Sequence, residues 1–312
     1  MNRVIGFAAV VLLLALASAA PAQQAIFVAG GHSGLRMISR NGTDWTNRVL
    51  GREGQVYRGF CFGQGKCVGV DTFGNDSILA VTTDGATWES YQKKHPAGEL
   101  FMQGITFGLG RFLAYGGNIA DDPGTYYAYR SADAVRWDEP IWQKNGKNLL
   151  RRIIVGDGVL VGVGDRGRRA VSKDGITWQS TPDYKAADTL IDVAFGNGIY
   201  VGVGLNGLRL RSRDGLTWTD RQVGEPGEHL NAVGWCDGRF VAVGLGATYV
   251  SPDGAAWQRT PNRNAPLTMA YGNGVFVGSH WKGRILMSRD AIDWRQVYQA
   301  DQHIETVAFG SL

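Results

Sequence analysis

Cysteine and histidine are both scarce in this chain, which limits the covalent and metal chemistry that it can support. Of the 312 residues, three are cysteines and five are histidines. An odd number of cysteines allows one disulfide and leaves one thiol over. The histidines are scattered singly, and no cysteine–histidine spacing typical of a zinc site occurs. The sequence therefore predicts no metal site and no cofactor.

A clear excess of charge and a helical hydrophobic pattern are also missing. Lys and Arg number 32 against 28 Asp and Glu, which gives a net charge of +4. A nucleic-acid-binding protein usually carries a clustered basic surface, so we expect no nucleic acid partner. No stretch after the first residues shows helical periodicity of useful length. The chain is therefore predicted to be all-β.

Only one long hydrophobic run is present, and it lies at the N-terminus. Arg3 precedes an apolar stretch over residues 4–19, and the small residues 20–22 follow. This pattern predicts a signal peptide over residues 1–22, a secreted or periplasmic location and a mature domain over residues 23–312. An uncleaved anchor is the alternative, although the run is shorter than the ~20 residues of a spanning helix. No membrane span is expected after cleavage, and we expect a monomer.

Glycine, in contrast, is abundant, and it recurs with tryptophan in a repeat. Glycine accounts for 45 residues, about twice its usual share of ~7%. A motif of the type Ser-Arg-Asp-Gly-Leu-Thr-Trp occurs seven times. The copies span residues 39–45, 82–88, 131–137, 172–178, 212–218, 251–257 and 288–294. Successive tryptophans are 43, 49, 41, 40, 39 and 37 residues apart, a period that suits one four-stranded propeller blade.

The copy that ends at Trp218 shows how each repeat divides into strands. Residues 192–196 and 199–203 lie on either side of an Asn-Gly dipeptide. This dipeptide favours a hairpin because both of its residues adopt positive φ readily. Residues 208–211 form a third strand, and a fourth strand begins at Trp218. Below, these are the first to fourth strands of a blade.

The two ends of the chain predict how the ring closes. Residues 306–310 repeat the first-strand pattern, whereas the mature N-terminus starts with a second-strand pattern at residues 25–30. One blade is therefore shared between the two ends. The predicted fold is a seven-bladed β-propeller of four-stranded blades, with its C-terminal strand paired to the N-terminal blade so that no sheet edge stays open.

The seven copies resemble the Asp-box, or bacterial neuraminidase repeat, of sialidase-like β-propellers. The family pattern is Ser-x-Asp-x-Gly-x-Thr-Trp, and this chain carries the shortened form Ser-x-Asp-Gly-x-Thr-Trp. The resemblance implies a propeller but no particular activity. We expect the motif carboxylate to accept backbone N–H groups in a tight turn and the tryptophan to pack between blades. These structural residues are Asn41, Asp84, Asp133, Asp174, Asp214, Asp253 and Asp290.

Ligand-binding residues are expected on the face opposite the Asp-boxes. We call it the loop face, because it carries the connections from second to third strands and from each blade to the next. The entrance to the first strand is polar in five of seven blades and would ring the mouth of the central channel. These positions are Arg58, Gln103, Arg151, Ile191, Asn231, Leu267 and Glu305. The arginines are suited to a carboxylate or sulfate; the alternative is charge pairing around the channel, such as Arg58 with Glu305.

Aromatic residues outside the repeat are also expected on the loop face. Tyr126, Tyr127 and Trp142 accompany an insertion in the longest repeat. They are predicted to form a surface for sugar rings, unless they only cover an enlarged blade edge. His280 and Trp281 lie in another second-to-third-strand connection and complete the predicted ligand-binding set.

An enzymatic alternative depends on carboxylates of the loop face, since a glycosidase needs two of them ~5–10 Å apart. The candidates are Asp71, Asp76, Asp121, Asp122, Asp165, Asp183, Asp188, Glu225, Glu228 and Asp301. The arginine triad, the Phe-Arg-Ile-Pro segment and the Tyr/Glu pair of sialidases are not recognisable. The leading prediction is a non-catalytic binding or scaffold propeller for a saccharide, an acidic peptide or an envelope protein. A glycoside hydrolase or polysaccharide lyase is the alternative.

Cys61 and Cys67 flank a predicted hairpin turn between first and second strands. A three-residue loop would place them opposite each other and allow a disulfide. A two-residue loop would place them on opposite faces of the sheet and forbid it. Cys236 is expected to stay unpaired.

Overall fold

The chain is built from short β-strands. The computed structural model describes residues 24–94, 101–118, 125–144, 150–182, 185–262 and 264–312. These ranges contain 27 strands and two short 3-10 turns but no α-helix. Within them, no helix has the length and apolarity that a membrane crossing requires. The predicted signal peptide lies outside the described residues. The all-β prediction is confirmed.

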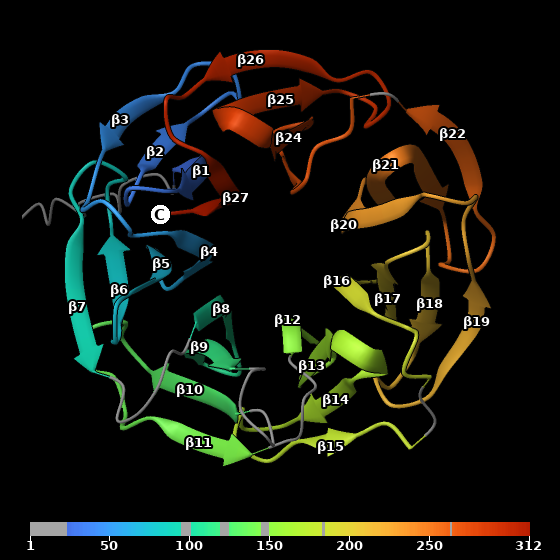
Figure 1. Cartoon of the computed structure of the whole chain (residues 1–312), viewed down its shortest axis with the longest axis horizontal. Helices are drawn as coiled ribbons and strands as arrows, with labels where there is room; N and C mark the ends of the chain where they lie inside the picture. Colours follow the sequence, from blue (N-terminus) through green and yellow to red (C-terminus); the bar gives the residue numbers. More distant parts are fainter. Residues whose placement is uncertain (1–23, 95–100, 119–124, 145–149, 183–184, 263) are drawn as a thin grey trace, which may run out of the picture.

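The strands form seven sheets arranged in a ring, one for each blade (Figure 1). Blade 1 consists of β27 (Ile304–Ser311), β1 (Ala25–Gly31), β2 (Arg36–Ser39) and β3 (Thr46–Val49). Blade 2 consists of β4 (Tyr57–Gly63), β5 (Lys66–Phe73), β6 (Asp76–Thr82) and β7 (Glu89–Lys94). Blade 3 consists of β8 (Phe101–Gly108), β9 (Arg111–Asn118), β10 (Thr125–Ser131) and β11 (Ile141–Lys144). Blade 4 consists of β12 (Leu150–Gly156), β13 (Val159–Gly164), β14 (Arg169–Ser172) and β15 (Gln179–Ser180).

The remaining blades follow the same order from the channel outward (Figure 1). Blade 5 consists of β16 (Leu190–Gly196), β17 (Ile199–Gly204), β18 (Arg209–Ser212) and β19 (Trp218–Gln222). Blade 6 consists of β20 (His229–Cys236), β21 (Arg239–Ser251) and β22 (Gln258–Asn262). Blade 7 consists of β23 (Ala270–Gly272), β24 (Val275–His280), β25 (Arg284–Ser288) and β26 (Arg295–Gln299). In blade 6, β21 fills the second and third positions, because its first half pairs with β20 and its second half with β22. The seven-bladed prediction is confirmed.

The C-terminal strand closes the ring as the sequence predicts. β27 pairs antiparallel with β1, with Phe309 opposite Phe27. Backbone hydrogen bonds in both directions between Gln24 and Leu312, at 3.3 and 3.1 Å, extend this pairing. The last strand therefore completes the blade that the N-terminal segment begins.

Glycines at the ends of the first strands lie against large side chains of the next blade. A Cβ added to Gly196 would lie 2.1 Å from the ring of Trp235, so only glycine fits there. The same close contact between a glycine and a side chain of the next blade recurs around the ring, including between blades 7, 1 and 2. The pairs are Gly63 with Phe107, Gly108 with Val155, Gly156 with Phe195, Gly272 with Phe309 and Gly310 with Phe62. These contacts hold the first strands of neighbouring blades close together.

Each of the seven repeat motifs, called Asp-boxes below after the pattern that they resemble, closes the turn between the third and fourth strands. In blade 5, Oδ1 of Asp214 accepts the backbone N–H of Leu216 at 2.8 Å and of Thr217 at 2.7 Å. The Ser212 hydroxyl donates to the same carboxylate and accepts the N–H of Gly215. All seven motifs repeat the two backbone bonds, with an asparagine oxygen as the acceptor in blade 1. The predicted role of the motif as a turn closure is confirmed.

The Asp-box also attaches its blade to the preceding one. A Cβ on Gly215 would lie 2.6 Å from Val161 and 2.8 Å from Val171, both in blade 4. Trp218 packs against a hydrophobic cluster that includes Val163 of the same neighbouring blade. Every other motif tryptophan likewise shares a hydrophobic cluster with the preceding blade, which confirms their predicted place between blades.

Candidate functional site

The channel-mouth residues predicted from the sequence occupy β-bulges. In blade 4, Leu150 pairs with Gly164 and Arg152 with Val163, so that Arg151 is left out of the ladder. Six blades skip one residue in this way: Arg58, Gln103, Arg151, Ile191, Asn231 and Glu305. A bulge re-aims the extra side chain away from the regular ladder. Leu267 differs, because β23 of its blade starts only at Ala270.

Part of this ring is already engaged within the fold. Arg151 is paired with Asp165, with Nε 2.6 Å from Oδ1. Glu305 is paired with His32 at 2.9 Å, so the pair of Arg58 with Glu305 that the alternative offered does not form. Arg58 is exposed and makes no hydrogen bond or ion pair with any described residue.

An ion pair just inside the mouth joins three blades, and sequence reasoning does not identify it. Nε of Arg152 lies 3.1 Å from Oδ1 of Asp192. The other oxygen of Asp192 accepts the backbone N–H of Val233 at 2.9 Å. The charge of Asp192 raises the pKa of Arg152. The pair thus ties the first strands of blades 4, 5 and 6 together.

The predicted sugar-binding surface of Tyr126, Tyr127 and Trp142 is wrong. Both tyrosines lie on β10 and are fully buried. Tyr126 packs edge-on against Trp178 of blade 4, with ring centroids 6.0 Å apart. Tyr127 stacks on Trp142 at 5.3 Å. Because alternate side chains of an inner strand point to the two neighbouring blades, these tyrosines are core residues. Trp142 lies on the outermost strand β11, in agreement with the alternative that it covers a blade edge.

Trp281 and Glu305 come together where blade 7 joins blade 1. Trp281 begins the 3-10 turn η2 (Trp281–Gly283) and is 60% exposed. Its indole stacks on the imidazole of His303, with centroids 5.3 Å apart and an interplanar angle of 13°. Nε2 of His303 lies 3.8 Å from the Glu305 oxygen that also contacts His32. We call Trp281, His303, Glu305 and His32 the seam cluster.

Sequence reasoning misses His32 and His303. His32 holds the position in blade 1 that Trp281 holds in blade 7, since both precede a residue with positive φ and then a glycine. This equivalence of corners is the signal that identifies His32. Burial lowers the pKa of His303, and the neighbouring His32 adds to this effect while Glu305 opposes it. No three His, Cys, Asp or Glu side chains in the described ranges are placed to hold a metal ion.

The predicted site residue His280 lies beside this cluster at the end of β24. Its Nδ1 is 2.6 Å from a guanidinium nitrogen of Arg284. Burial, followed by the charge of Arg284, lowers the pKa of His280. The imidazole thus holds the arginine at the base of the Trp281 corner.

Two buried candidate carboxylates are held by partners inside the fold. Asp71 accepts the side-chain amide of Gln55 at 2.9 Å and the backbone N–H of Val56 at 2.7 Å. Burial raises the pKa of Asp71 to about 6. Asp188 forms a bidentate pair with Arg221, the shortest bond being 2.8 Å.

Glu228 is bound even more extensively. One oxygen accepts two hydrogen bonds from Arg259, and the other accepts the hydroxyl of Tyr249 at 2.5 Å. Although partial burial raises it, the hydrogen bonds from Tyr249 and Arg259 lower the pKa of Glu228 overall. The carboxylate thus connects β21 and β22 to the start of β20.

The other candidate carboxylates have a partner, are exposed or lie outside the described residues. Asp76, Asp165 and Asp301 each contact an amide or guanidinium group, and Glu225 is exposed. Asp121, Asp122 and Asp183 lie outside the described residues.

The hairpin between Cys61 and Cys67 has a two-residue loop. Gly63 pairs with Lys66, and Cys67 pairs with Phe62 rather than with Cys61. The two thiols therefore lie on opposite faces of the sheet, and a disulfide between them is excluded. All three cysteines are free, and burial raises the pKa of Cys236 to about 12.

Exposed apolar side chains are distributed unequally between the two faces. Eight large hydrophobic residues are exposed in the described ranges. Only Leu109, in a hairpin, and Val135, in an Asp-box, lie on the Asp-box face. The six others lie on the loop face: Leu50, Phe101, Leu205, Val223, Leu245 and Trp281.

Three of these side chains form one patch across blades 5 and 6. His229 pairs with both Leu205 and Leu245, so both leucines flank the same residue. Val223 adjoins them, since the N–H of the next residue, Gly224, bonds the carbonyl of Asn206 beside Leu205. We call Leu205, Val223 and Leu245 the corner patch.

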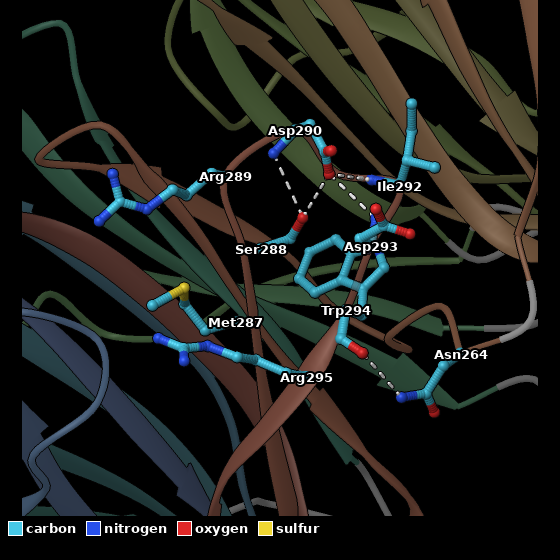
Figure 2. Close-up of a pocket in the computed structure, with 9 residues that line it drawn as sticks. All are labelled: Asn264, Met287, Ser288, Arg289, Asp290, Ile292, Asp293, Trp294 and Arg295. Carbon is cyan, nitrogen blue, oxygen red and sulfur yellow. Dashed lines mark hydrogen bonds between the residues drawn. The ribbon is translucent and has the colours of Figure 1, made fainter.

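Hollows are found beside the Asp-boxes of blades 1, 5 and 7. The hollow in blade 7 measures about 630 Å³ and is lined by the residues drawn in Figure 2. Figure 2 shows that the Asp290 carboxylate is turned toward its own backbone and Ser288 rather than into open space. Equivalent hollows lie beside Asp214 and Asn41. Their recurrence indicates that they follow from the repeat geometry.

No protein-family model matches this chain, and no curated protein does. Solved structures do. YCF48 bound to a D1 peptide superposes with a TM-score of 0.58 at 19% identity, covering 78% of this chain and 82% of that one. Sqt1 of Saccharomyces cerevisiae gives 0.62 at 11%, covering 92% and 85%. The WD40 β-propeller domain of Doa1 gives 0.60 at 12%, covering 89% and 88%. At these identities the comparisons show the fold alone, which is that of a β-propeller.

Proposed function

We propose that the protein is an exported, non-catalytic binding propeller of the Asp-box type, which docks an acidic peptide segment of a protein partner on its loop face. The observation that carries the proposal is the unequal distribution of exposed apolar residues. The same strands reach both faces, so the fold by itself gives no reason to expose leucine, valine and tryptophan mainly on one of them. Contiguous exposed apolar surface is typical of interaction sites.

The charges of the loop face favour an acidic partner. Exposed basic side chains without an ion pair to a described residue are Arg52, Arg58, Lys94, Arg166, Lys185 and Lys282. Among the described residues of this face, the corresponding acidic side chains are Glu53 and Glu225. Complementary charge speeds association and excludes wrong partners. An acidic segment that also carries apolar side chains fits both the corner patch and this surplus of positive charge.

The contacts of the candidate carboxylates support binding rather than hydrolysis. A glycosidase needs one carboxyl group to protonate the leaving oxygen and a second to act as nucleophile or base. Asp188 and Glu228 are each held by an arginine, and Asp71 is held by Gln55 and a backbone N–H. None of the three lines the hollows described above. The structure of YCF48 with a peptide supports the proposal by analogy of fold.

Selection of phage-displayed random peptides on the immobilised protein tests the proposal. We expect the enriched peptides to combine acidic with apolar residues. Replacing Leu245→Ser should raise their dissociation constant by about tenfold, since it removes the most exposed apolar side chain of the patch. Fluorescence polarisation with a labelled peptide measures the change.

The matched control is Val135→Ser, which replaces an exposed apolar residue of the opposite face. It should leave peptide affinity unchanged. If no peptide is enriched, or if only Val135→Ser weakens binding, the proposal is wrong. Cleavage of a bound glycan by the wild-type protein would instead support the enzymatic alternative.

A further inference from the structure

Trp281 occupies a corner that recurs around the loop face. In blades 1, 4, 5 and 7 the second strand is followed by a leading residue, then by a residue with positive φ and then by a glycine. The leading residues are His32, Asp165, Leu205 and Trp281. The backbone frame is therefore common to four blades, whereas the side chain that it presents is specific to each. Only blade 7 presents an aromatic side chain of this size.

The Trp281 corner is held rigidly from below. The N–H of Ala300 bonds the carbonyl of Gly283 at 2.8 Å. A Cβ on Gly283 would lie 2.4 Å from the carbonyl oxygens of Ala300 and Gln302, so the corner lies directly on the connection to β27. The imidazole of His303 then supports one face of the indole. A fixed platform avoids the entropy loss that a mobile side chain incurs on binding.

The other face of the indole is open to solvent, because the residue is 60% exposed although its stacking partner covers one side. Purely structural stacking does not require this exposure. Leu205, at the equivalent corner of blade 5, has no ring that could stack on a neighbour. Its corner nevertheless has the same backbone geometry. The stack therefore presents the Trp281 ring outward rather than stabilising the turn.

The polar groups beside the platform suit hydroxyl groups. One oxygen of the Glu305 carboxylate contacts His32 and His303. Its other oxygen has no hydrogen bond or ion pair with a described residue. His32 is half-exposed, and it pairs with Val56, two residues before the free guanidinium of Arg58. Carboxylate, imidazole and guanidinium groups donate or accept in one plane, which matches adjacent hydroxyls on a ring.

Charges of both signs surround Trp281. Arg48, Lys282, Arg284 and Arg58 lie on the neighbouring segments together with Glu305 and Asp301, and Arg48 lies 3.8 Å from Asp301. The Glu305 carboxylate lies directly beside the stack of Trp281 on His303, so an anion placed on the indole would be repelled. A neutral ligand therefore fits the Trp281 ring better than an anion does.

We infer that the seam cluster binds a neutral sugar ring, with its apolar C–H face on Trp281 and its hydroxyl groups directed to Glu305 and His32. This site is separate from the corner patch, and the inference does not depend on the peptide proposal. Aromatic rings bind such ligands because one surface is apolar while polar groups lie at its edge.

Isothermal titration calorimetry of the wild-type protein with cellohexaose, chitohexaose, maltohexaose and mannohexaose tests the inference. We expect at least one of these neutral hexasaccharides to bind. Trp281→Ala should raise its dissociation constant by about tenfold, whereas Trp281→Phe should retain most of the affinity. Glu305→Gln should weaken binding without removing it, since the amide still accepts one hydroxyl.

Leu205→Ala is the matched control, because it truncates the equivalent corner of blade 5. It should leave hexasaccharide binding unchanged and weaken the selected peptides instead, so that failure of either proposal is visible separately. Melting curves verify that the variants are folded. The inference is overturned if no hexasaccharide binds, or if Trp281→Ala and Glu305→Gln both bind it as the wild type does. It is also overturned if Trp281→Ala affects only peptide binding.

Discussion

In each Asp-box, one side-chain oxygen accepts the hydrogen bonds that close the turn. Oδ1 of Asp214 accepts two backbone N–H groups and a serine hydroxyl. In blade 1 the carbonyl oxygen of Asn41 makes the same bonds to the backbone. The turn therefore needs an acceptor in this position, and a negative charge is not essential to it. Symmetric repetition in seven blades agrees with a structural role.

This interpretation predicts that Asp214→Ala destabilises the protein much more than Asp214→Asn. The alanine variant leaves two N–H groups without their acceptor and should lose about 1–3 kcal/mol of unfolding free energy. The asparagine variant keeps the acceptor, as blade 1 does. Urea unfolding at neutral pH measures both. Equal losses in the two variants would show that the charge, rather than the acceptor, matters.

The same pair of proteins should differ in pH dependence. Although partial burial raises it, hydrogen bonds from Thr217 and Leu216 lower the pKa of Asp214 overall. A carboxyl group with a lowered folded pKa stabilises the fold above its unfolded value of about 3.9 and loses this contribution as the pH falls through the folded value. The stability advantage of the wild type over Asp214→Asn should therefore shrink below about pH 4. A constant difference down to the acid transition would contradict this assignment.

At the scale of the strand and turn, glycine serves two distinct purposes. Gly238, in a hairpin of blade 6, and Gly215, in the Asp-box of blade 5, have nearly the same φ of +74° and +75°. A Cβ on Gly238 meets no atom within 4 Å, whereas one on Gly215 would lie 2.6 Å from Val161. The first glycine serves only the backbone conformation, and the second also allows close approach of two blades.

Comparison of Gly215→Ala with Gly238→Ala separates these effects. Gly238→Ala should cost about 1–2 kcal/mol for the left-handed conformation. Gly215→Ala should cost an additional ~1–3 kcal/mol, because the methyl group forces the blades apart. Ala134 and Ala291 show that the motif accepts a buried methyl group where the preceding blade leaves room. Guanidinium unfolding gives both values, and equal losses would mean that the contact between blades is not limiting.

Strand boundaries follow the sequence closely where the signals are local. In blade 5 the sequence predicts strands over 192–196 and 199–203, and the structure has them at Leu190–Gly196 and Ile199–Gly204. The hairpin dipeptide and the alternation of side chains are enough for this. The assignment fails at Tyr126 and Tyr127, which lie on β10 rather than in a loop. An insertion nearby shifts the apparent position of a strand, and only packing against the next blade shows which side chains are buried.

At the scale of the whole molecule, the ring depends on its last strand. β27 contributes the pairing with β1 and places Phe309 on Gly272 and Phe62 against Gly310. It also supplies Glu305 to the seam cluster, and His303 directly precedes it. The closure and the proposed sugar site thus depend on the same segment.

Deleting residues 303–312 should remove cooperative unfolding or cause aggregation, because it exposes the edge of β1 and opens two blade contacts. Circular dichroism during heating and light scattering measure this. A synthetic peptide of the deleted sequence, added in trans, should restore a cooperative transition, whereas a scrambled peptide of the same composition should not. A truncated protein that melts within a few degrees of the parent would contradict the closure described here.

The sequence by itself determined the number of blades, the order of strands within them, the Asp-box turns and the closure of the ring. All of these depend on signals a few residues long that recur seven times, or on a comparison of the two chain ends. Only the tertiary structure decided which polar and aromatic residues meet. Trp281, His303 and His32 lie far apart in the sequence, and their contacts arise because two blade corners and the closing strand converge at one seam. The burial of Tyr126 and the pairing of Arg151 with Asp165 are also tertiary effects. Both depend on contacts between separate strands or blades, which no local sequence pattern encodes.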